Sequence, residues 1–251
     1  MSVVGILSLA LAGAAAGAIN SVVGSGTLVT FPVLLALGYA PVSANVSNTI
    51  GLAPGSLSGA WGYRRRLAGQ RSCTVWLGAS SVLGGATGAV LLLVLPASSF
   101  AEIVPGFVAV AVILTVLQPR LNARFQKHDV RTGRARRVLT VLTVYATAVY
   151  GGYFGAGQGI LLIAILAVML AQDLQRTNAL KNVLTGVING VAGLYFVIAT
   201  HVEWGPASII ALGSITGAQL GARFGQRLKP GTLRAVIVAV GILAIIDLAL
   251  S

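Results

Sequence analysis

Two glycine-rich segments with polar neighbours are the best candidates for ligand binding in this 251-residue sequence. They read Asn20-Ser-Val-Val-Gly-Ser-Gly-Thr27 and Gly151-Gly-Tyr-Phe-Gly-Ala-Gly-Gln-Gly159. An apolar helical piece follows each, so unpaired backbone N–H groups and the positive ends of two helix dipoles are expected there. Two such helix N-termini facing one cavity favour an anion. The candidate substrate-binding residues in these two tips are Asn20, Ser21, Gly24, Ser25, Gly26, Thr27, Gly155, Gly157, Gln158 and Gly159.

Each residue type in the tips has a separate expected role. Glycine permits close approach of the backbone to a ligand, and we expect Gly26 and Gly159 to present their N–H groups. The side chains that could add neutral hydrogen bonds are Ser21, Ser25, Thr27 and Gln158.

A second polar set lies within apolar runs further along the chain. Its candidate site residues are Asn45, Asn48, Asn178, Lys181, Asn182 and Asn189. Asn45 and Asn48 are three residues apart, as are Asn178 and Lys181, so each pair shares a helix face. Asn45 and Asn178 could instead serve as helix caps or as interhelical hydrogen-bonding groups. Lys181 could attract an anion, or it could extend along the helix to the cytoplasmic surface.

The sequence offers no catalytic, metal or cofactor site. Carboxylates are absent from the apolar runs except for Asp247, so no acid chain for a proton relay is expected. The two histidines fall in loops and Cys73 stands alone, so no metal-ligand spacing exists. The string Gly24-Ser25-Gly26 has no histidine nearby to activate the serine, which argues against an intramembrane hydrolase.

The elements that position these residues must lie in a lipid bilayer. Hydrophobic residues make up 56% of the chain and charged residues 9%, whereas soluble domains carry about 25% charged residues. The net charge of +12 does not indicate a nucleic-acid partner. Such proteins need a basic surface interleaved with stacking aromatic residues, and here the basic residues occur in four short clusters between apolar runs.

The apolar runs predict an all-α integral membrane protein, a polytopic helical bundle. Runs close to the ~20 residues that cross a bilayer are 43–63, 73–95, 101–118, 178–200, 205–222 and 233–250. Regions 3–38 and 138–171 are too long for one span and are interrupted by glycine. Each divides into two pieces, 3–19 with 27–38 and 138–153 with 159–171, and is expected to form a broken re-entrant hairpin whose tip lines a cavity.

Lysine and arginine predict the orientation, because cytoplasmic loops hold the excess of both. All 17 fall in four clusters: Arg64, Arg65, Arg66 and Arg71; Arg120, Arg124, Lys127, Arg131, Arg134, Arg136 and Arg137; Arg176 and Lys181; and Arg223, Arg227, Lys229 and Arg234. If all four clusters lie inside the cell, both chain termini lie outside it. The protein is expected in the cytoplasmic membrane. The basic loop 119–137 could lie against anionic lipid, although we favour a role in fixing topology.

An offset of 133 residues superimposes the first part of the sequence on the second. It matches Gly24 with Gly157, Gly26 with Gly159, Leu28 with Leu161, Asn45 with Asn178, Ser81 with Ser214, Gly84 with Gly217, and Gly88-Ala89 with Gly221-Ala222. The halves are then 1–118 and 138–251, joined by 119–137, and each has one hairpin plus three spans. That odd number of crossings inverts the second half, a common plan of secondary transporters with a midplane site.

Taken with their flanks, the tips resemble the sulfite exporter TauE/SafE family of membrane transporters. The first half carries the resemblance in Gly24-Ser-Gly26, Pro32, Ala44-Asn-Val-Ser-Asn-Thr49 and Tyr63-Arg-Arg-Arg66. The second half carries it in Gly151 to Ile160, Asn178-Ala-Leu-Lys-Asn182, Asn189 and the segment from Gly213 to Arg223. The resemblance implies a cytoplasmic-membrane carrier for sulfite, organosulfonates such as sulfoacetate, or related sulfur anions.

The working hypothesis is a secondary transporter that binds a small anion between the two tips. Replacing Gly26 or Gly159 with leucine should then abolish transport and leave folding intact. The alternatives are a carrier of another small solute, carboxylate or neutral, and a non-transporting membrane protein, which predicts tightly packed tips. Oligomeric state, direction and coupling ion are left open.

Overall fold

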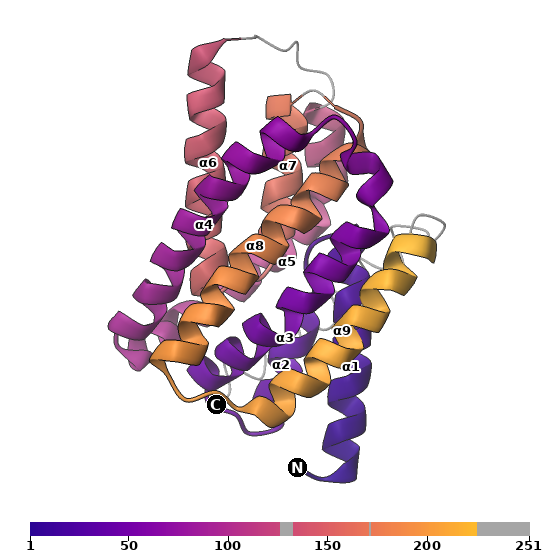
Figure 1. The fold of residues 1–251 in the computed structure, drawn as a ribbon. Helices are drawn as coiled ribbons and strands as arrows, with labels where there is room; N and C mark the ends of the chain where they lie inside the picture. Colours follow the sequence, from indigo (N-terminus) through magenta and orange to yellow (C-terminus); the bar gives the residue numbers. More distant parts are fainter. Residues whose placement is uncertain (126–132, 171, 225–251) are drawn as a thin grey trace.

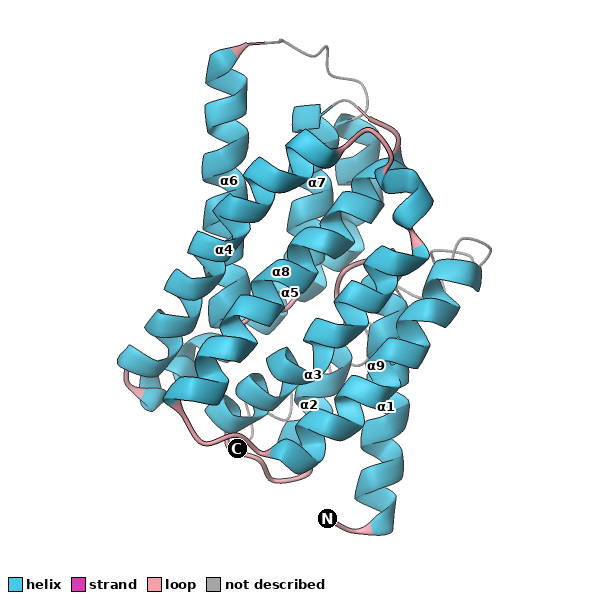
Figure 2. Cartoon of the chain, in the orientation of Figure 1, coloured by secondary structure: helices cyan, strands magenta, loops and turns pink. Residues whose placement is uncertain are grey.

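The structure, a computed structural model, describes residues 1–125, 133–170 and 172–224 (Figure 1). Within these ranges the chain is helical and has no strand (Figure 2). The helices are α1 (Val3–Val22), α2 (Thr27–Ala36), α3 (Pro41–Gly62), the 3-10 turn η1 (Arg64–Leu67), α4 (Arg71–Val94), α5 (Ala97–Phe125), α6 (Arg134–Tyr153), α7 (Gln158–Leu170), α8 (Leu174–Ala199) and α9 (Trp204–Phe224).

These bounds confirm the helices that the apolar runs predict. Five of the predicted spans correspond to α3, α4, α5, α8 and α9, and the two interrupted regions divide into α1 with α2 and α6 with α7. Helix α5 continues to Phe125 and α6 begins at Arg134, so helix extends further into segment 119–137 than expected. The predicted span 233–250, Asp247, the C-terminus and residues 126–132 lie outside the described residues.

Local sequence explains where several helices begin. The Ser2 hydroxyl accepts a hydrogen bond from the Gly5 N–H at 3.1 Å and caps α1. Pro41 occupies the first turn of α3, where its missing N–H costs nothing. Asp173 caps α8 by accepting from the Gln175 and Arg176 amides, each at 3.0 Å. Helix α8 therefore starts at a fixed point two turns before Lys181.

The helices pack in corresponding pairs. Helix α1 packs along α9 and α6 packs along α4, while α3 and α8 contact each other between these pairs (Figure 1). Glycines allow the close approach: a Cβ at Gly217 would overlap the Ala14 carbonyl on α1, and a Cβ at Gly88 would overlap the Val149 carbonyl on α6. Gly84, Gly88, Gly217 and Gly221 therefore serve helix packing.

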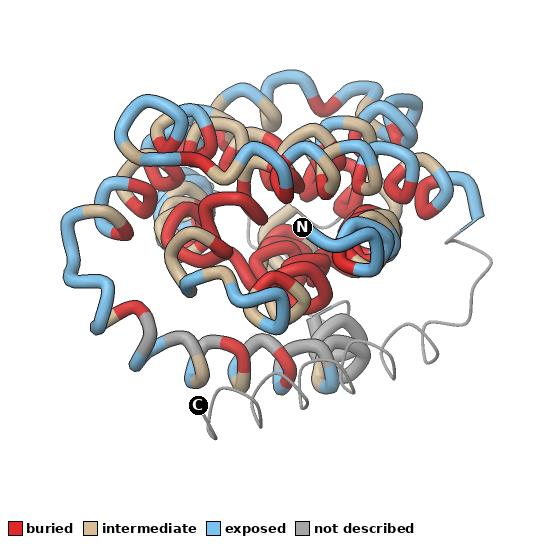
Figure 3. Tube along the Cα trace, turned by 90° about the horizontal axis from the view of Figure 1, so that it is seen from below, coloured by how far each residue is buried: buried red, intermediate tan, exposed pale blue. Residues whose placement is uncertain are grey.

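Apolar side chains on the outer faces indicate a membrane environment. Helices α1, α4 and α8 are each long and apolar enough to cross a bilayer, and 44%, 44% and 50% of their most apolar windows are buried inside the protein. The remainder faces outward, as the exposed rim of Figure 3 shows. Val4, Leu83, Ile198 and Leu212 are among the exposed apolar residues. Such a surface needs lipid to cover it.

The described basic segments gather at one end of the molecule. Helices α4, α6 and α8 begin in the upper part of Figure 1, where η1 also lies, α9 ends at the right at about mid-height, and the N-terminus lies at the lower end. Arg64, Arg65 and Arg66 lie in η1, and Arg223 lies in the last turn of α9. Which side of the membrane these segments face stays a prediction.

Candidate functional site

The two glycine tips contact each other directly. The N–H of Gly159, at the start of α7, donates to the carbonyl oxygen of Gly24 at 3.1 Å. Gly24 and Gly157 both have positive φ, +93° and +72°, which favours glycine at each turn. A Cβ at Gly24 would lie 2.5 Å from the Gly159 Cα. The Gly159 amide is thus occupied here and not free for a ligand, contrary to our expectation.

Gly26 has a packing role that the sequence did not reveal. A Cβ at this position would lie 2.5 Å from the Ala16 carbonyl oxygen of α1. A leucine side chain at Gly26 or at Gly159 would therefore overlap backbone atoms of a neighbouring segment. Only a shift of the helices could relieve that overlap. The expectation that these two leucine variants fold normally is wrong, and a test of the site needs other residues.

The end of α1 receives three hydrogen-bond donors from α8. A helix leaves its last four carbonyls without intrahelical partners. Here Asn178 Nδ2 and Asn182 Nδ2 donate to the Ser21 carbonyl at 2.9 and 3.0 Å. Lys181 Nζ donates to the Asn20 carbonyl at 2.5 Å. Three of the four α8 residues predicted to be near a ligand are thus brought together at the break between α1 and α2.

Lys181 is a fully buried lysine. None of its side chain is exposed, so it does not extend to the cytoplasmic surface. Besides the Asn20 carbonyl, its ammonium donates to Asn182 Oδ1 at 2.9 Å. Both acceptors are neutral, and within the described residues they use two of the three N–H donors of the ammonium. A buried charge is costly without a counter-charge, so this position would favour a negatively charged ligand.

The end of α6 is capped in the same manner by the other half of the chain. Asn45 Nδ2, on α3, donates to the Tyr153 carbonyl at 2.8 Å. Asn45 and Asn178 are matched by the offset of 133 residues. Each asparagine therefore satisfies the broken helix of the opposite half. Of the two roles considered for them, capping of a helix end is the one observed, and the capped end is the C-terminal end of another helix.

The first half lacks a counterpart to the charge of Lys181. The offset matches Lys181 with Asn48, which donates from Nδ2 to Thr27 Oγ1 at 3.3 Å. Asn48 Oδ1 in turn accepts from the Thr30 hydroxyl. This neutral group fixes α2 against α3 and leaves the two halves electrostatically unequal.

Beside the tips, some buried polar atoms have no partner among the described residues. Gln158 Nε2 donates to Asn189 Oδ1 at 2.8 Å, whereas Gln158 Oε1 is without a hydrogen bond. The Ser25 hydroxyl and Asn178 Oδ1 are also buried without a partner in this part of the chain. Buried polar groups are usually satisfied. These three side chains therefore have hydrogen-bonding capacity to offer a ligand.

Sequence reasoning missed Ser56 and an aromatic group next to the second tip. Ser56 accepts from Asn20 Nδ2 at 3.0 Å. The offset of 133 residues matches Ser56 with Asn189, so the repeat itself held the signal. The ring of Phe154 contacts Phe31 edge to face at 5.1 Å and Phe100 at 5.8 Å between centroids. Nothing in the spacing of these aromatics indicated that they would meet.

Comparison with known proteins now identifies the family. The sulfite exporter TauE/SafE family matches residues 9–248. The chain belongs to the TauE/SafE sulfite exporter family. It is therefore a multi-pass membrane protein of a transporter family, not an enzyme, and the resemblance seen in the sequence is confirmed.

Relatives in three bacteria carry transporter names. The probable membrane transporter protein YfcA of Escherichia coli K12 is 26% identical over 233 residues, 90% of this chain and 82% of the relative. A probable membrane transporter protein of Haemophilus influenzae is 24% identical over 230 residues, 90% and 87% of the two chains. The probable membrane transporter protein ORF9 of a Sinorhizobium species is 26% identical over 228 residues, 90% and 85%. No solved structure matches significantly.

Proposed function

We propose that this TauE/SafE protein transports a small anion, sulfite or an organosulfonate such as sulfoacetate, by alternating access through a site between the two glycine tips. The observation that carries the proposal is Lys181, a fully buried lysine whose amine donates only to neutral acceptors in the described structure, so that an anion beside it would stabilise its charged form. Two helix N-termini, those of α2 and α7, begin at the same tips. A substrate anion would neutralise the lysine and interact favourably with both helix dipoles.

The proposed architecture is an inverted repeat with re-entrant hairpins, whose tips lie near the membrane midplane and whose termini lie outside the cell. Its support is the reciprocal capping of α1 by Asn178 and of α6 by Asn45. Further support comes from the glycines of α4 and α9, which the offset matches and which pack on α6 and α1 respectively. Alternating access would then exchange the roles of the two halves.

Binding would begin by separating the tips. The Gly159 N–H would exchange the Gly24 carbonyl for an oxygen of the anion. Lys181 would supply charge through its remaining donor, the Ser25 hydroxyl could donate a further hydrogen bond, and Gln158 could do so through its amide. The exchange keeps a hydrogen bond at the Gly159 amide but takes this donor from the Gly24 carbonyl, so its cost falls on that carbonyl and on tip packing.

Flux measurements on purified protein in liposomes test the proposal. We expect the protein to carry labelled sulfite or sulfoacetate, with an excess of the same unlabelled anion reducing the labelled flux. Acetate and a neutral organic solute of similar size form the comparison arms. If the protein carries the neutral solute but carries neither sulfite nor sulfoacetate, the anion assignment is rejected.

The contact between the tips favours one other candidate, a non-transporting membrane protein. Such a protein would keep the Gly159 amide bonded to Gly24 at all times. Absence of flux for every solute from a folded, liposome-inserted protein would support this candidate over transport.

A further inference from the structure

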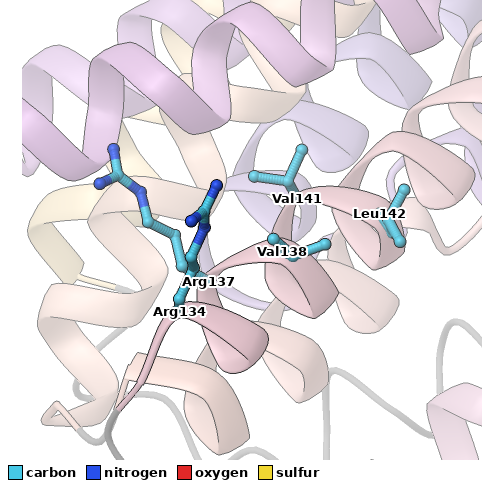
Figure 4. A pocket seen from close by; sticks show the side chains of 5 residues that line it. All are labelled: Arg134, Arg137, Val138, Val141 and Leu142. Atoms are coloured by element: carbon cyan, nitrogen blue, oxygen red, sulfur yellow. The ribbon is translucent and has the colours of Figure 1, made fainter.

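The start of α6, at the opposite end of this helix from the second tip, has arginines around an apolar hollow. The hollow has a volume of about 450 Å³ and is lined by Arg134, Arg137, Val138, Val141 and Leu142 (Figure 4). A second hollow of about 300 Å³ shares Arg137 and includes Trp76 of α4 and Leu170 of α7. The two hollows meet at Arg137, at the end of the molecule where the basic segments gather.

The exposed side chains of α6 change from basic to apolar over its first turns. Arg134 and Arg137 are exposed in the first turn, and Val138 and Leu142 are exposed immediately after them. From Arg134 to Leu142 the helix rises about 12 Å, comparable to the distance from a lipid phosphate into the start of the acyl region. The Arg137 guanidinium lies 5.2 Å from the ring centroid of Trp76, and tryptophan is enriched at the membrane–water interface.

We propose that this hollow binds an anionic phospholipid, with the phosphate on Arg134 and Arg137 and an acyl chain along Val138, Val141 and Leu142. Guanidinium groups match phosphate oxygens through paired hydrogen bonds. No aspartate or glutamate is among the described residues that line either hollow, so none competes for the arginines there. Basic hollows at this depth recognise anionic head groups. The inference does not depend on which solute the protein carries.

Fluorescence of Trp76 can report the lipid, because this residue lines the second hollow and its ring contacts Arg137, which lines both hollows. In a Trp61→Phe, Trp204→Phe background Trp76 is the remaining tryptophan. The protein is placed in liposomes that contain phosphatidylglycerol or phosphatidylcholine brominated on the acyl chains, at equal mole fraction. Quenching is expressed relative to the unbrominated lipid, which removes any direct effect of Arg137 on the emission.

Brominated phosphatidylglycerol should quench Trp76 more strongly than brominated phosphatidylcholine. Each arginine near an anionic surface is expected to contribute about a 5-fold preference. The Arg134→Gln/Arg137→Gln variant should therefore bind both lipids about equally. Arg64→Gln/Arg65→Gln is the matched control, since it also removes two arginine charges, from η1 and outside the lining of both hollows.

Three outcomes would overturn the proposal. These are equal quenching by the two lipids in the parent, a preference that survives in the Arg134/Arg137 variant, and an equal loss of preference in the control. The last would mean that general surface charge, and not this hollow, attracts the lipid. Retained preference in the control together with loss in the variant supports the site.

Discussion

Lys181→Met removes the buried charge and keeps a straight, apolar side chain. In the parent, the ammonium donates to the Asn20 carbonyl and to Asn182 Oδ1 and is fully buried. The substitution leaves both acceptors in place and takes away only the positive charge and its donors. Lys181→Arg is the conservative companion, because it keeps the charge.

The expected effect on anion affinity follows from the charge at this depth. A single negative charge about 4 Å from Nζ gains ~4 kcal/mol at an effective dielectric constant of ~20. Loss of that term raises the dissociation constant on the order of 10³-fold. A neutral solute would lose far less, since it has no net charge to pair with the ammonium.

Ligand-dependent unfolding in detergent measures this loss. With the anion at ~100 times the parent dissociation constant, the parent gains ~2.7 kcal/mol. At the same concentration Lys181→Met should gain only ~0.1 kcal/mol, and Lys181→Arg should keep most of the stabilisation. Gln70→Met is the matched control, because Gln70 is buried and donates to the Arg66 and Arg176 carbonyls at 2.8 and 3.4 Å without carrying charge.

The outcome that refutes the reasoning is specific to the ligand. If the anion stabilises Lys181→Met as strongly as it stabilises the parent and Gln70→Met, the lysine does not contribute to binding. A lower stability of Lys181→Met without ligand would not count against the account. The two orphaned acceptors cost about 1–3 kcal/mol each, partly offset because no charge is buried any longer.

The other predictions concern packing, capping and orientation. Gly217→Ala should destabilise the fold by about 1–3 kcal/mol in thermal unfolding, because its methyl group would meet the backbone of α1. Gly190→Ala has no described atom within 4 Å of the new carbon and should be neutral or stabilising by up to ~1 kcal/mol, so equal losses would contradict the packing. Asn45→Leu should cost about 1–3 kcal/mol by leaving the last turn of α6 uncapped, and an unchanged melting temperature would show that water replaces the amide. In a cysteine-free background, Ser2→Cys should react with an impermeant thiol reagent in intact cells and Arg65→Cys only after permeabilisation, and the reverse pattern would invert the topology.

Helix boundaries and breaks could be predicted from the sequence because each depends on local composition. Apolar runs of the length of a bilayer predicted α3, α4 and α8 to within a few residues. Glycine-rich strings predicted that helix would stop at the two tips, and Gly24 and Gly155, which directly follow the C-caps of α1 and α6, have the positive φ that ends a helix.

The partners of the polar residues could not be predicted, because they depend on helices far apart in the sequence. Asn45 caps a carbonyl 108 residues away and Lys181 one 161 residues away. Local spacing placed Asn178 and Lys181 on one face of a helix but did not indicate what that face would contact. For the same reason, the sequence left two environments open for Lys181, and packing against α1 selected the buried one.

The contact between the tips was missed for a related reason. The sequence identified two places where backbone amides are exposed by helix breaks, but not that one tip would satisfy the other. The Gly159 N–H donates a hydrogen bond to the Gly24 carbonyl because the two halves of the chain pack against each other at the tips. The same glycines that permit a ligand to approach also permit this contact, so composition alone does not distinguish the two.

The most direct test of the central claim is an experimental structure of the protein with sulfite or sulfoacetate bound. The account predicts an anionic group within hydrogen-bonding distance of Lys181 Nζ, with the Gly159 amide released from the Gly24 carbonyl. An anion bound elsewhere, with the contact between the tips intact and Lys181 still held only by Asn20 and Asn182, would contradict it.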